Sequence, residues 1–255
     1  METYAAVVLA GGAARRMGGV DKPALPVGGQ PMRDRVLAAV ADATSRVVVG
    51  AADAVPMGVR VVREDPPGGG PVAAAAAGLA LLDSDTSLVA LLAADLPLLT
   101  RAAIGDLLKH LDQQTPDTES AGGGPAPAPP ARDDLAAPPA RGDLAPARGD
   151  LAPARGDLAP ARDDLGGGER QPDGACFVDG DGRRQSLCGV WRVAALRAAL
   201  DRLTVERGGS LSGAPVRALL AGLVVREVQW SGEGPPPWFD CDTDEDVRRA
   251  EEWAR

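Results

Sequence analysis

The sequence predicts an α/β protein in three layers, α/β/α, in which a mostly parallel central sheet carries helices on both faces. Short apolar runs of strand length alternate with helical stretches, a pattern typical of βαβ units. Glycines follow the first apolar run directly, where a buried strand must end in a sharp turn. The 255 residues are 45% hydrophobic and 25% charged, so the chain can bury a sizeable core.

The strongest functional signal lies directly after the first strand, which we expect over Tyr4 to Ala10. The segment from Leu9 to Lys22 combines glycines, which leave backbone N–H groups uncovered, with cationic side chains. This combination suits a bound polyphosphate. Alternatively, these glycines only form a turn and bind no ligand. The spacing of the glycines and of Lys22 matches neither a Walker-type loop nor a dinucleotide fingerprint. The residues concerned are Gly11, Gly12, Gly18, Gly19, Arg15, Arg16 and Lys22.

The next elements alternate between helix and strand. A helix over Pro31 to Ala41 precedes two β-branched strands, at residues 46–49 and 59–62. An acidic, Pro/Gly-rich break then leads to an alanine-rich helix from Val72 to Leu82, whose small side chains let neighbouring backbone approach closely. Ligands of parallel sheets gather at the carboxyl ends of the strands, which is where the glycine segment already lies.

A carboxylate follows the most continuously apolar strand, Ser87 to Leu92. Asp95 lies just beyond the end of this strand, and a proline restrains the chain two residues later. A carboxylate in that position is well placed to bind Mg²⁺ on a triphosphate. Alternatively, Asp95 only makes the turn ahead of the next helix, Arg101 to Leu111, which Thr100 caps.

Residues 113–172 differ in composition from the rest of the chain. They are rich in Pro, Gly and Ala and repeat Ala-Arg-Gly-Asp-Leu-Ala-Pro at a seven-residue period. Because proline interrupts every repeat, we expect a disordered linker inserted into one domain, which residues 1–112 and 173–255 form together. An adhesion role for the Arg-Gly-Asp triplets would require an extracellular location, which nothing else in the sequence favours.

The chain beyond the insertion supplies a hairpin, two helices, a strand and a final helix. Thr243 and Asp246 are spaced as a capping box for the final helix. That cap does not account for Asp240 and Asp242 just upstream, and Asp242 is a second candidate ligand for the metal. The expected ranges are 175–178 and 186–191 for the hairpin strands, 192–203 and 211–220 for the helices, and 223–228 for the last strand.

The motifs occur in an order that resembles a known family. Leu-Ala-Gly-Gly-x-x-x-Arg-Met-Gly, Asp-Lys-Pro and Leu-Pro-Val-Gly-Gly follow one another between Leu9 and Gly29. This order resembles the signature of the nucleotidyltransferases that join a nucleoside triphosphate to a phosphate or sugar phosphate. The stretch from Gly11 to Lys22 is most similar to the molybdenum cofactor guanylyltransferases. The resemblance implies a Rossmann-like nucleotidyltransferase fold.

The resemblance also implies roles for individual residues. Backbone amides at the end of the first strand would hold the base and the phosphates, two cations would neutralise the triphosphate, and an acidic residue before the alanine-rich helix would help to hold the nucleotide. These residues are Leu9, Ala10, Gly11 and Gly12 for the amides, Arg16 and Lys22 for the cations, and Asp65 for the acidic residue.

The metal ligands follow from the same resemblance. Asp95 would bind Mg²⁺ and complete a catalytic set with Arg16 and Lys22. The segment that contains Asp240 and Asp242 resembles a family element with two asparagines near the active site. Because this chain has aspartates there, Asp242 as a second Mg²⁺ ligand departs from the family pattern.

The resemblance implies transfer of GMP from GTP to a molybdopterin-type cofactor, with release of pyrophosphate. Two alternatives stay open. The first keeps the chemistry and is a cytidylyltransferase for the same cofactor, or a guanylyltransferase for another phosphorylated acceptor. The second belongs to a different class and is a catalytically inactive nucleotide-binding module that acts through its repeat segment.

Charge and composition limit the other partners. The formal net charge is −9, and no basic stripe is present to meet nucleic acid or anionic lipid. No apolar run approaches the ~20 residues of a membrane span, and no basic region leads an apolar segment at the N-terminus. We therefore expect a cytoplasmic monomer or weak homo-oligomer. The cysteines, Cys176, Cys188 and Cys241, lack metal-site spacing and are expected to be free thiols.

Overall fold

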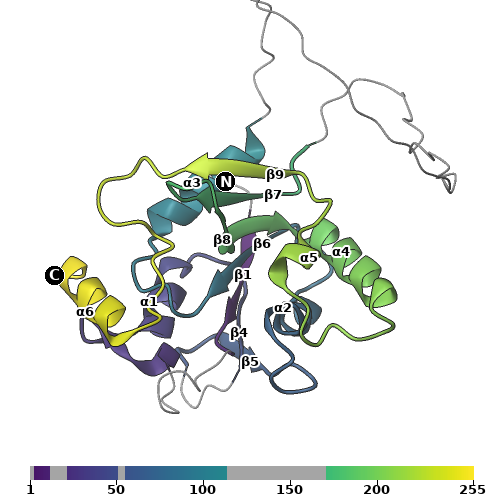
Figure 1. Cartoon of the computed structure of the whole chain (residues 1–255), viewed down its shortest axis with the longest axis horizontal. Coiled ribbons are helices and arrows are strands. Elements are labelled where there is room, and N and C mark those ends of the chain that lie inside the picture. The colour runs from purple at the N-terminus through teal and green to yellow at the C-terminus, as the bar shows by residue number, and fades with distance from the viewer. Residues whose placement is uncertain (1–2, 12–21, 51–54, 114–170) are drawn as a thin grey trace, which may run out of the picture. The chain divides into compact units, whose positions relative to one another are not determined.

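The computed structural model describes residues 3–11, 22–50, 55–113 and 171–255. Their centre is a seven-stranded sheet in the order β5-β4-β1-β6-β8-β7-β9 (Figure 1). The strands are β1 (Tyr4–Leu9), β4 (Arg46–Val49), β5 (Val59–Val62), β6 (Leu88–Ala93), β7 (Gly174–Val178), β8 (Arg184–Arg192) and β9 (Val225–Gln229).

The sheet is mostly parallel, as the sequence predicts. β1 pairs in parallel with both β4 and β6, and β4 does so with β5. β8 runs antiparallel to both of its neighbours, β6 and β7, while β7 and β9 are parallel. The β6–β8 pairing joins segments from both sides of the interval 114–170 into one sheet.

Helices cover both faces of the sheet, which confirms the predicted three layers. Alternate residues of β1 point to opposite faces, so Ala6 belongs to one buried core and Val7 to the other. The first core is closed by α1 (Met32–Ala39) and α3 (Arg101–Asp112). The second core is closed by α2 (Pro71–Ala80), α4 (Val193–Glu206) and α5 (Val216–Leu219), which lie on the other side of the strands in Figure 1.

The alanine-rich helix α2 packs closely on the sheet. A Cβ atom at Gly78 would lie 2.4 Å from Val7 Cγ1 and 3.0 Å from Val49 Cγ2. The lack of a side chain at this position therefore sets how near α2 comes to β1 and β4. Thr100 caps α3 by accepting a hydrogen bond from the Ala103 N–H, as predicted.

The predicted helix over residues 211–220 is wrong in extent. Only α5, from Val216 to Leu219, is helical. Gly213 has a left-handed φ of +70° and donates its N–H to the Gly69 carbonyl, so it bonds outside any helix. Pro215 then takes the N-cap position, where proline is tolerated, and the helix begins after it.

A third, smaller apolar cluster lies beside the central sheet and was not predicted. It joins the short antiparallel pair β2 (Pro26–Val27) and β3 (Gln30–Pro31) to α6 (Asp244–Trp253), through Val27, Met32, Cys241 and Ala250 among others. The 3₁₀ turn η2, Lys22–Ala24, precedes β2. The two segments that carry Lys22 and Asp242 therefore share one packed cluster.

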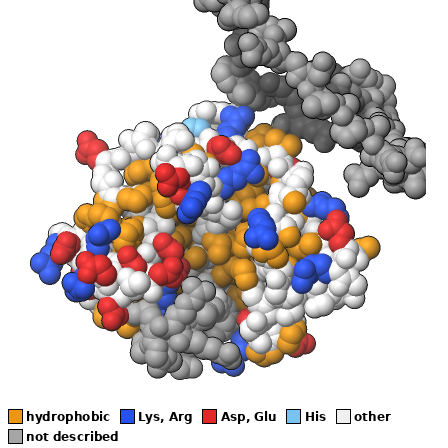
Figure 2. Space-filling model, in the orientation of Figure 1, with side chains coloured by type: hydrophobic (Ala, Val, Ile, Leu, Met, Phe, Trp, Pro, Cys, Tyr) orange, Lys and Arg blue, Asp and Glu red, His pale blue; other side chains and the backbone are white. Residues whose placement is uncertain are grey.

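Several predicted features lie outside the described residues: Gly12, Arg15 and Arg16, Gly18 and Gly19, and the repeat segment. Within the described ranges, no helix has the length and apolar character to span a bilayer. Acidic and basic side chains are interspersed on the face seen in Figure 2. The three cysteines are buried free thiols, as expected.

Candidate active site

Three side chains from distant parts of the sequence meet at one point. Lys22 Nζ lies 2.6 Å from Asp95 Oδ2 and 2.8 Å from Asp242 Oδ1, so its ammonium group bridges the two carboxylates. The side chains of Lys22 and Asp95 are 15% and 24% exposed, whereas that of Asp242 is 62% exposed. The cluster therefore lies at the surface but is partly screened from water.

The sheet places Asp95 next to the end of β1. Leu9 is in register with Ala93, and the Ala94 N–H donates to the Leu9 carbonyl at 3.0 Å. The chain of β6 thus ends beside the start of the glycine segment. The Cys241 N–H donates to the Asp95 carbonyl at 3.3 Å, which ties the segment before α6 to the same place.

Asp242 is positioned by the start of α6. Thr243 is the N-cap and accepts a hydrogen bond from the Asp246 N–H, while the Asp246 carboxylate accepts from the Thr243 N–H at 2.9 Å. This is the predicted capping box. Because the box uses Asp246 and Thr243, the Asp242 carboxylate remains available to Lys22.

Electrostatics hold Lys22 in its charged form. Burial by itself would lower the pKa of Lys22, but hydrogen bonds and charge interactions with Asp242 and Asp95 outweigh it and raise the pKa above its ordinary value. Lys22 is therefore a permanent cation at physiological pH, and a charge of this kind can bind an anionic group.

The two carboxylates fit the requirements of Mg²⁺. The Lys22 ammonium contacts both Asp95 and Asp242 at once, so one oxygen of each carboxylate faces the same cation. Among the described residues, no cluster of three or more potential metal-ligating side chains occurs. A pair of carboxylates suits Mg²⁺, which commonly takes one or two carboxylates and fills its other positions with water and substrate phosphates.

Asp240 is the third acidic side chain near this point. Burial, followed by the charges of Asp242 and Asp95, raises its pKa above the ordinary value. A carboxyl group whose pKa is raised in this way binds its proton more tightly in the folded protein than in the unfolded chain. It therefore lowers the free energy of unfolding once the pH exceeds about 4, the pKa of an unfolded-chain aspartate.

We expect Asp240→Asn to unfold at a higher urea concentration than the wild type at pH 7. The asparagine has no charge to repel Asp242 and Asp95, so the gain should shrink as the pH is lowered from 7 towards 4. Urea unfolding at both pH values measures the effect. Asp85→Asn, at an exposed position before β6, is the control, and an equal gain in that variant would contradict the explanation.

Only part of the predicted nucleotide segment is described. Leu9 pairs with Val49 and Ala93 inside the sheet, and the Ala10 N–H donates to the Val49 carbonyl at 2.8 Å. The Ala10 amide is therefore occupied by the sheet. Within the described residues, the Gly11 N–H has no hydrogen-bond partner and is the first amide beyond the sheet that can meet a ligand.

Among the described residues, the acidic side chain next to Gly11 is that of Glu64, for which the sequence predicted no role. A Cβ atom at Gly11 would lie 3.4 Å from Glu64 Oε1, so the Glu64 carboxylate lies next to the Gly11 backbone. Glu64 is 8% exposed and accepts a hydrogen bond from the Gly68 N–H at 3.0 Å. The predicted nucleotide ligand Asp65 is exposed, and no contact places it at Gly11 among the described residues.

Comparison with known proteins identifies the family. Residues 6–222 match the model of the MobA-like NTP transferase domain. The chain belongs to this family. Because the matched region runs from β1 through α5, it includes Lys22, Glu64 and Asp95 of this MobA-like chain, whereas Asp242 lies beyond it.

One curated relative of this MobA-like chain aligns with about half of it. A probable molybdenum cofactor guanylyltransferase of Haloferax mediterranei is 33% identical over 136 residues, which is 49% of this chain and 63% of that protein. The alignment thus spans less than two thirds of the relative.

Two solved structures share the fold at lower identity. One is the 2-C-methyl-D-erythritol 4-phosphate cytidylyltransferase from Thermus thermophilus, with a TM-score of 0.57, 16% identity and 99% coverage of both chains. The other is molybdopterin-guanine dinucleotide biosynthesis protein A from Archaeoglobus fulgidus, with a TM-score of 0.55, 17% identity and 97% coverage of both chains.

Proposed function

We propose that the protein transfers GMP from GTP to the terminal phosphate of a molybdopterin-type cofactor and releases pyrophosphate. The observation that carries this proposal is the Lys22–Asp95–Asp242 cluster at the carboxyl ends of β1 and β6, beside the exposed Gly11. Membership of the MobA-like family and the resemblance to a probable guanylyltransferase favour the choice of nucleotide and acceptor.

The reaction requires the protein to position the two substrates and to neutralise the charge of their phosphates. An oxygen of the acceptor phosphate attacks the α-phosphorus of GTP, and the bond to the bridging α–β oxygen breaks, so that pyrophosphate leaves with that electron pair. The attacking oxygen is already anionic, so no side chain has to remove a proton. A Mg²⁺ ion held by Asp95 and Asp242 would neutralise phosphate oxygens when bound.

Lys22 has two sets of possible partners in this scheme. Its ammonium group contacts Asp95 and Asp242 in the structure, and a triphosphate would compete for the same positive charge. We propose that Lys22 turns from these carboxylates to the phosphates when nucleotide binds, which leaves both carboxylates to the metal. Arg16, outside the described residues, is the second proposed phosphate-binding cation.

Glu64 provides a basis for selecting guanine. The guanine edge carries two adjacent donors, N1–H and the N2 amino group, and a carboxylate can accept both at once. Cytosine has no such donor pair. We propose that the base lies against Gly11 and that the Glu64 carboxylate, which is close to this glycine and already oriented by the Gly68 N–H, accepts from it.

This role predicts a change in nucleotide preference for Glu64→Gln. We expect kcat/KM for GTP to fall about tenfold or more, since a bidentate contact is worth about 1–3 kcal/mol of discrimination. The value for ITP, which lacks the N2 amino group, should fall less. Pyrophosphate release measured with both nucleotides gives the ratio.

The neighbouring carboxylate offers a matched control for this experiment. Asp65→Asn removes the negative charge of the next residue, whose side chain is exposed. The ratio of kcat/KM for GTP to that for ITP should therefore remain that of the wild type. A ratio that changed in Asp65→Asn and not in Glu64→Gln would return the nucleotide role to Asp65.

The direct test of the function is a panel of GTP, CTP, ATP and UTP. Each is supplied with Mg²⁺ and molybdopterin, and pyrophosphate release is followed. We expect turnover with GTP above all. Turnover with CTP above GTP would make the protein a cytidylyltransferase, and saturable GTP binding without turnover on any acceptor would favour the inactive nucleotide-binding module.

A further inference from the structure

The guanidinium group of Arg35, on α1, joins two segments that carry residues of the candidate site. Its Nε–H donates to the Pro97 carbonyl at 2.7 Å, and its Nη1 donates to the Val27 carbonyl at 3.3 Å. Val27 belongs to β2, which follows Lys22, and Pro97 lies two residues beyond Asp95. The side chain of Arg35 therefore contacts both of the chain segments that hold the Lys22–Asp95 pair.

The turn that carries Lys22 is firmly attached to β2 and α1. The Leu25 N–H donates to the Lys22 carbonyl at 3.0 Å, and the Met32 N–H donates to the Leu25 carbonyl at 3.0 Å. Val27 and Met32 are both fully buried in the apolar cluster beside the sheet. Because this turn is packed as one unit, a displacement of Val27 also displaces Lys22.

The chain between Asp95 and the carbonyl that Arg35 holds is short and stiff. Proline restricts the backbone at Pro97, and the Leu99 N–H donates to the Leu96 carbonyl at 3.1 Å to close a turn. The hydrogen bond from Arg35 therefore fixes this turn, and with it Asp95, relative to β2.

The loop between β2 and β3 is also tied to α6, whose first turn follows Asp242. The Gly28 N–H donates to Glu251 Oε1 at 3.0 Å, and Gly28 has a left-handed φ of +59°. A Cβ atom at Gly28 would lie 3.0 Å from Arg35 Nη1 and 3.3 Å from Ala254 Cβ. The lack of a side chain at Gly28 thus lets α6 and the guanidinium group approach the same loop, so all three segments of the candidate site meet here.

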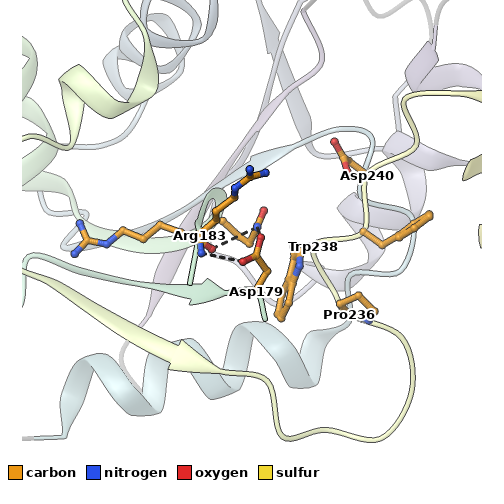
Figure 3. A pocket seen from close by; sticks show the side chains of 8 residues that line it. Asp179, Arg183, Pro236, Trp238 and Asp240 are labelled. Atoms are coloured by element: carbon orange, nitrogen blue, oxygen red, sulfur yellow. Dashed lines mark hydrogen bonds between the residues drawn. The ribbon is translucent and has the colours of Figure 1, made fainter. Parts of the chain in front are cut away.

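The segment before α6 also borders open space. Trp238 and Asp240 line a pocket of about 460 Å³ together with Arg183 of the β7–β8 hairpin (Figure 3). Close packing does not hold this segment on the side of the pocket. Its position therefore depends more strongly on directed hydrogen bonds, such as those at the loop between β2 and β3.

The chemistry of arginine suits a bridge between two carbonyls. A planar guanidinium group has several N–H donors in fixed directions, so it can bind two acceptors at once. Among the described residues, both hydrogen bonds of the Arg35 side chain go to main-chain carbonyls, and no carboxylate pairs with it. The contact fixes a distance between two segments and does not neutralise an acidic side chain.

We infer that Arg35 is a positioning residue for nucleotide transfer, which sets the distance between the Lys22 ammonium and the Asp95 carboxylate. The inference rests on the proposed function and adds a residue outside the cluster on which the geometry of the cluster depends. A misplacement of reacting groups by about 1 Å can cost about 10²-fold in rate. Loss of the bridge should therefore lower kcat more than it raises the KM for GTP.

Carbodiimide cross-linking tests the distance without nucleotide or metal. A water-soluble carbodiimide joins a carboxylate to an amine in contact with it, and the reagent takes up the water that amide formation releases. Lys22 Nζ lies 2.6 Å from Asp95 Oδ2, and the chain has a single other lysine, Lys109, so mass spectrometry can assign the product. We expect the Lys22–Asp95 amide in the wild type, and a severalfold lower yield in Arg35→Met.

Kinetics of the same variant tests the consequence for the reaction. In Arg35→Met, kcat should fall about 10-fold to 10²-fold, while the KM for GTP changes by less than about threefold. Arg35→Lys keeps the positive charge but lacks the planar group, so both its cross-linking yield and its kcat should stay close to those of Arg35→Met. Circular dichroism establishes folding, and Arg35→Lys carries both measurements if Arg35→Met does not fold.

Arg197→Met is the matched control. Arg197, on α4, also donates to two main-chain carbonyls, those of Leu79 and Leu82, each at 3.3 Å. The chain at Leu82 leads into the amino end of β6, whereas Asp95 follows the carboxyl end of that strand. This variant loses the same kind of bridge at the opposite edge of the sheet, so it should keep the wild-type cross-linking yield and the wild-type kcat.

The outcomes separate this inference from the proposed function. The inference is overturned if the folded Arg35 variants keep the wild-type yield of the Lys22–Asp95 amide, if Arg35→Lys regains the wild-type kcat, or if Arg197→Met loses as much as Arg35→Met. If the yield falls as expected but the wild type transfers no nucleotide from any triphosphate, the nucleotide-transfer function fails, while the control of the Lys22–Asp95 distance by Arg35 stands.

Discussion

Lys22→Met is expected to lower kcat/KM for GTP by about 10²–10³, the range found when one preorganised donor to a developing charge is removed. Methionine keeps the length and apolar stem of the side chain but cannot neutralise phosphate oxygens. Pyrophosphate release measures the loss, and circular dichroism with thermal melting establishes that the variant remains folded.

The sequence itself offers the control for this variant. The chain has a single other lysine, Lys109, which is exposed near the end of α3. Lys109→Met removes the same charge far from the cluster and should keep wild-type turnover. Equal turnover of Lys22→Met and the wild type would exclude Lys22 from the reaction.

Mg²⁺ binding without nucleotide provides a second readout for Lys22. In the wild type the ammonium group occupies the space between Asp95 and Asp242. Lys22→Met removes this competitor and leaves two carboxylates facing each other, so its affinity for Mg²⁺ should rise. Calorimetric titration with Mg²⁺ compares the two proteins, and weaker binding by the variant would argue against a shared metal site.

Asp95→Asn should lower kcat by about 10³, since charge stabilisation of several kcal/mol by a bound metal corresponds to a factor of this size. Asp242→Asn should lower it less, by about tenfold. The Asp95 side chain is the more buried of the two, at 24% against 62% exposed, and charge interactions are weaker where water screens them.

A titration with Mg²⁺ tests whether the two carboxylates share one ion. In both variants the Mg²⁺ concentration for half-maximal rate should increase, because each lacks one of the two proposed charged ligands. Asp85→Asn alters an exposed aspartate that precedes the same strand, β6, and should behave like the wild type. Unchanged Mg²⁺ dependence in Asp242→Asn would leave Asp95 as the metal ligand and give Asp242 only the contact with Lys22.

Most of the fold followed from local sequence patterns, and a tertiary contact overrode the pattern in one predicted helix. β1 and β6 are apolar throughout because both of their faces are covered by helices, so continuous apolar runs predict them correctly. Turn residues mark their ends, and Thr100 and Thr243 cap the helices that the sequence assigns to them. The helix over residues 211–220 failed because Gly213 bonds to Gly69, a partner far away in the sequence.

The sequence predicted those parts of the candidate site whose positions follow from the order of the strands. A carboxylate after a central parallel strand must lie at the same sheet edge as a glycine segment after the neighbouring strand, so Asp95 and Gly11 follow from topology. The sequence did not show which of the two acidic residues, Glu64 or Asp65, lies next to Gly11. Adjacent residues beyond a strand point in different directions, and which of them turns inward depends on the local path of the backbone.

By itself, the sequence determined the layered α/β fold, the strands that end at the site, and the residue types gathered there, because periodicity and turn chemistry are local properties of the chain. Only the tertiary structure decided that Lys22 bridges Asp95 and Asp242, that Glu64 lies at Gly11, and that Arg183 and Trp238 share a pocket. Each of these contacts joins residues from separate segments, so its geometry depends on how the helices and hairpin pack around the sheet.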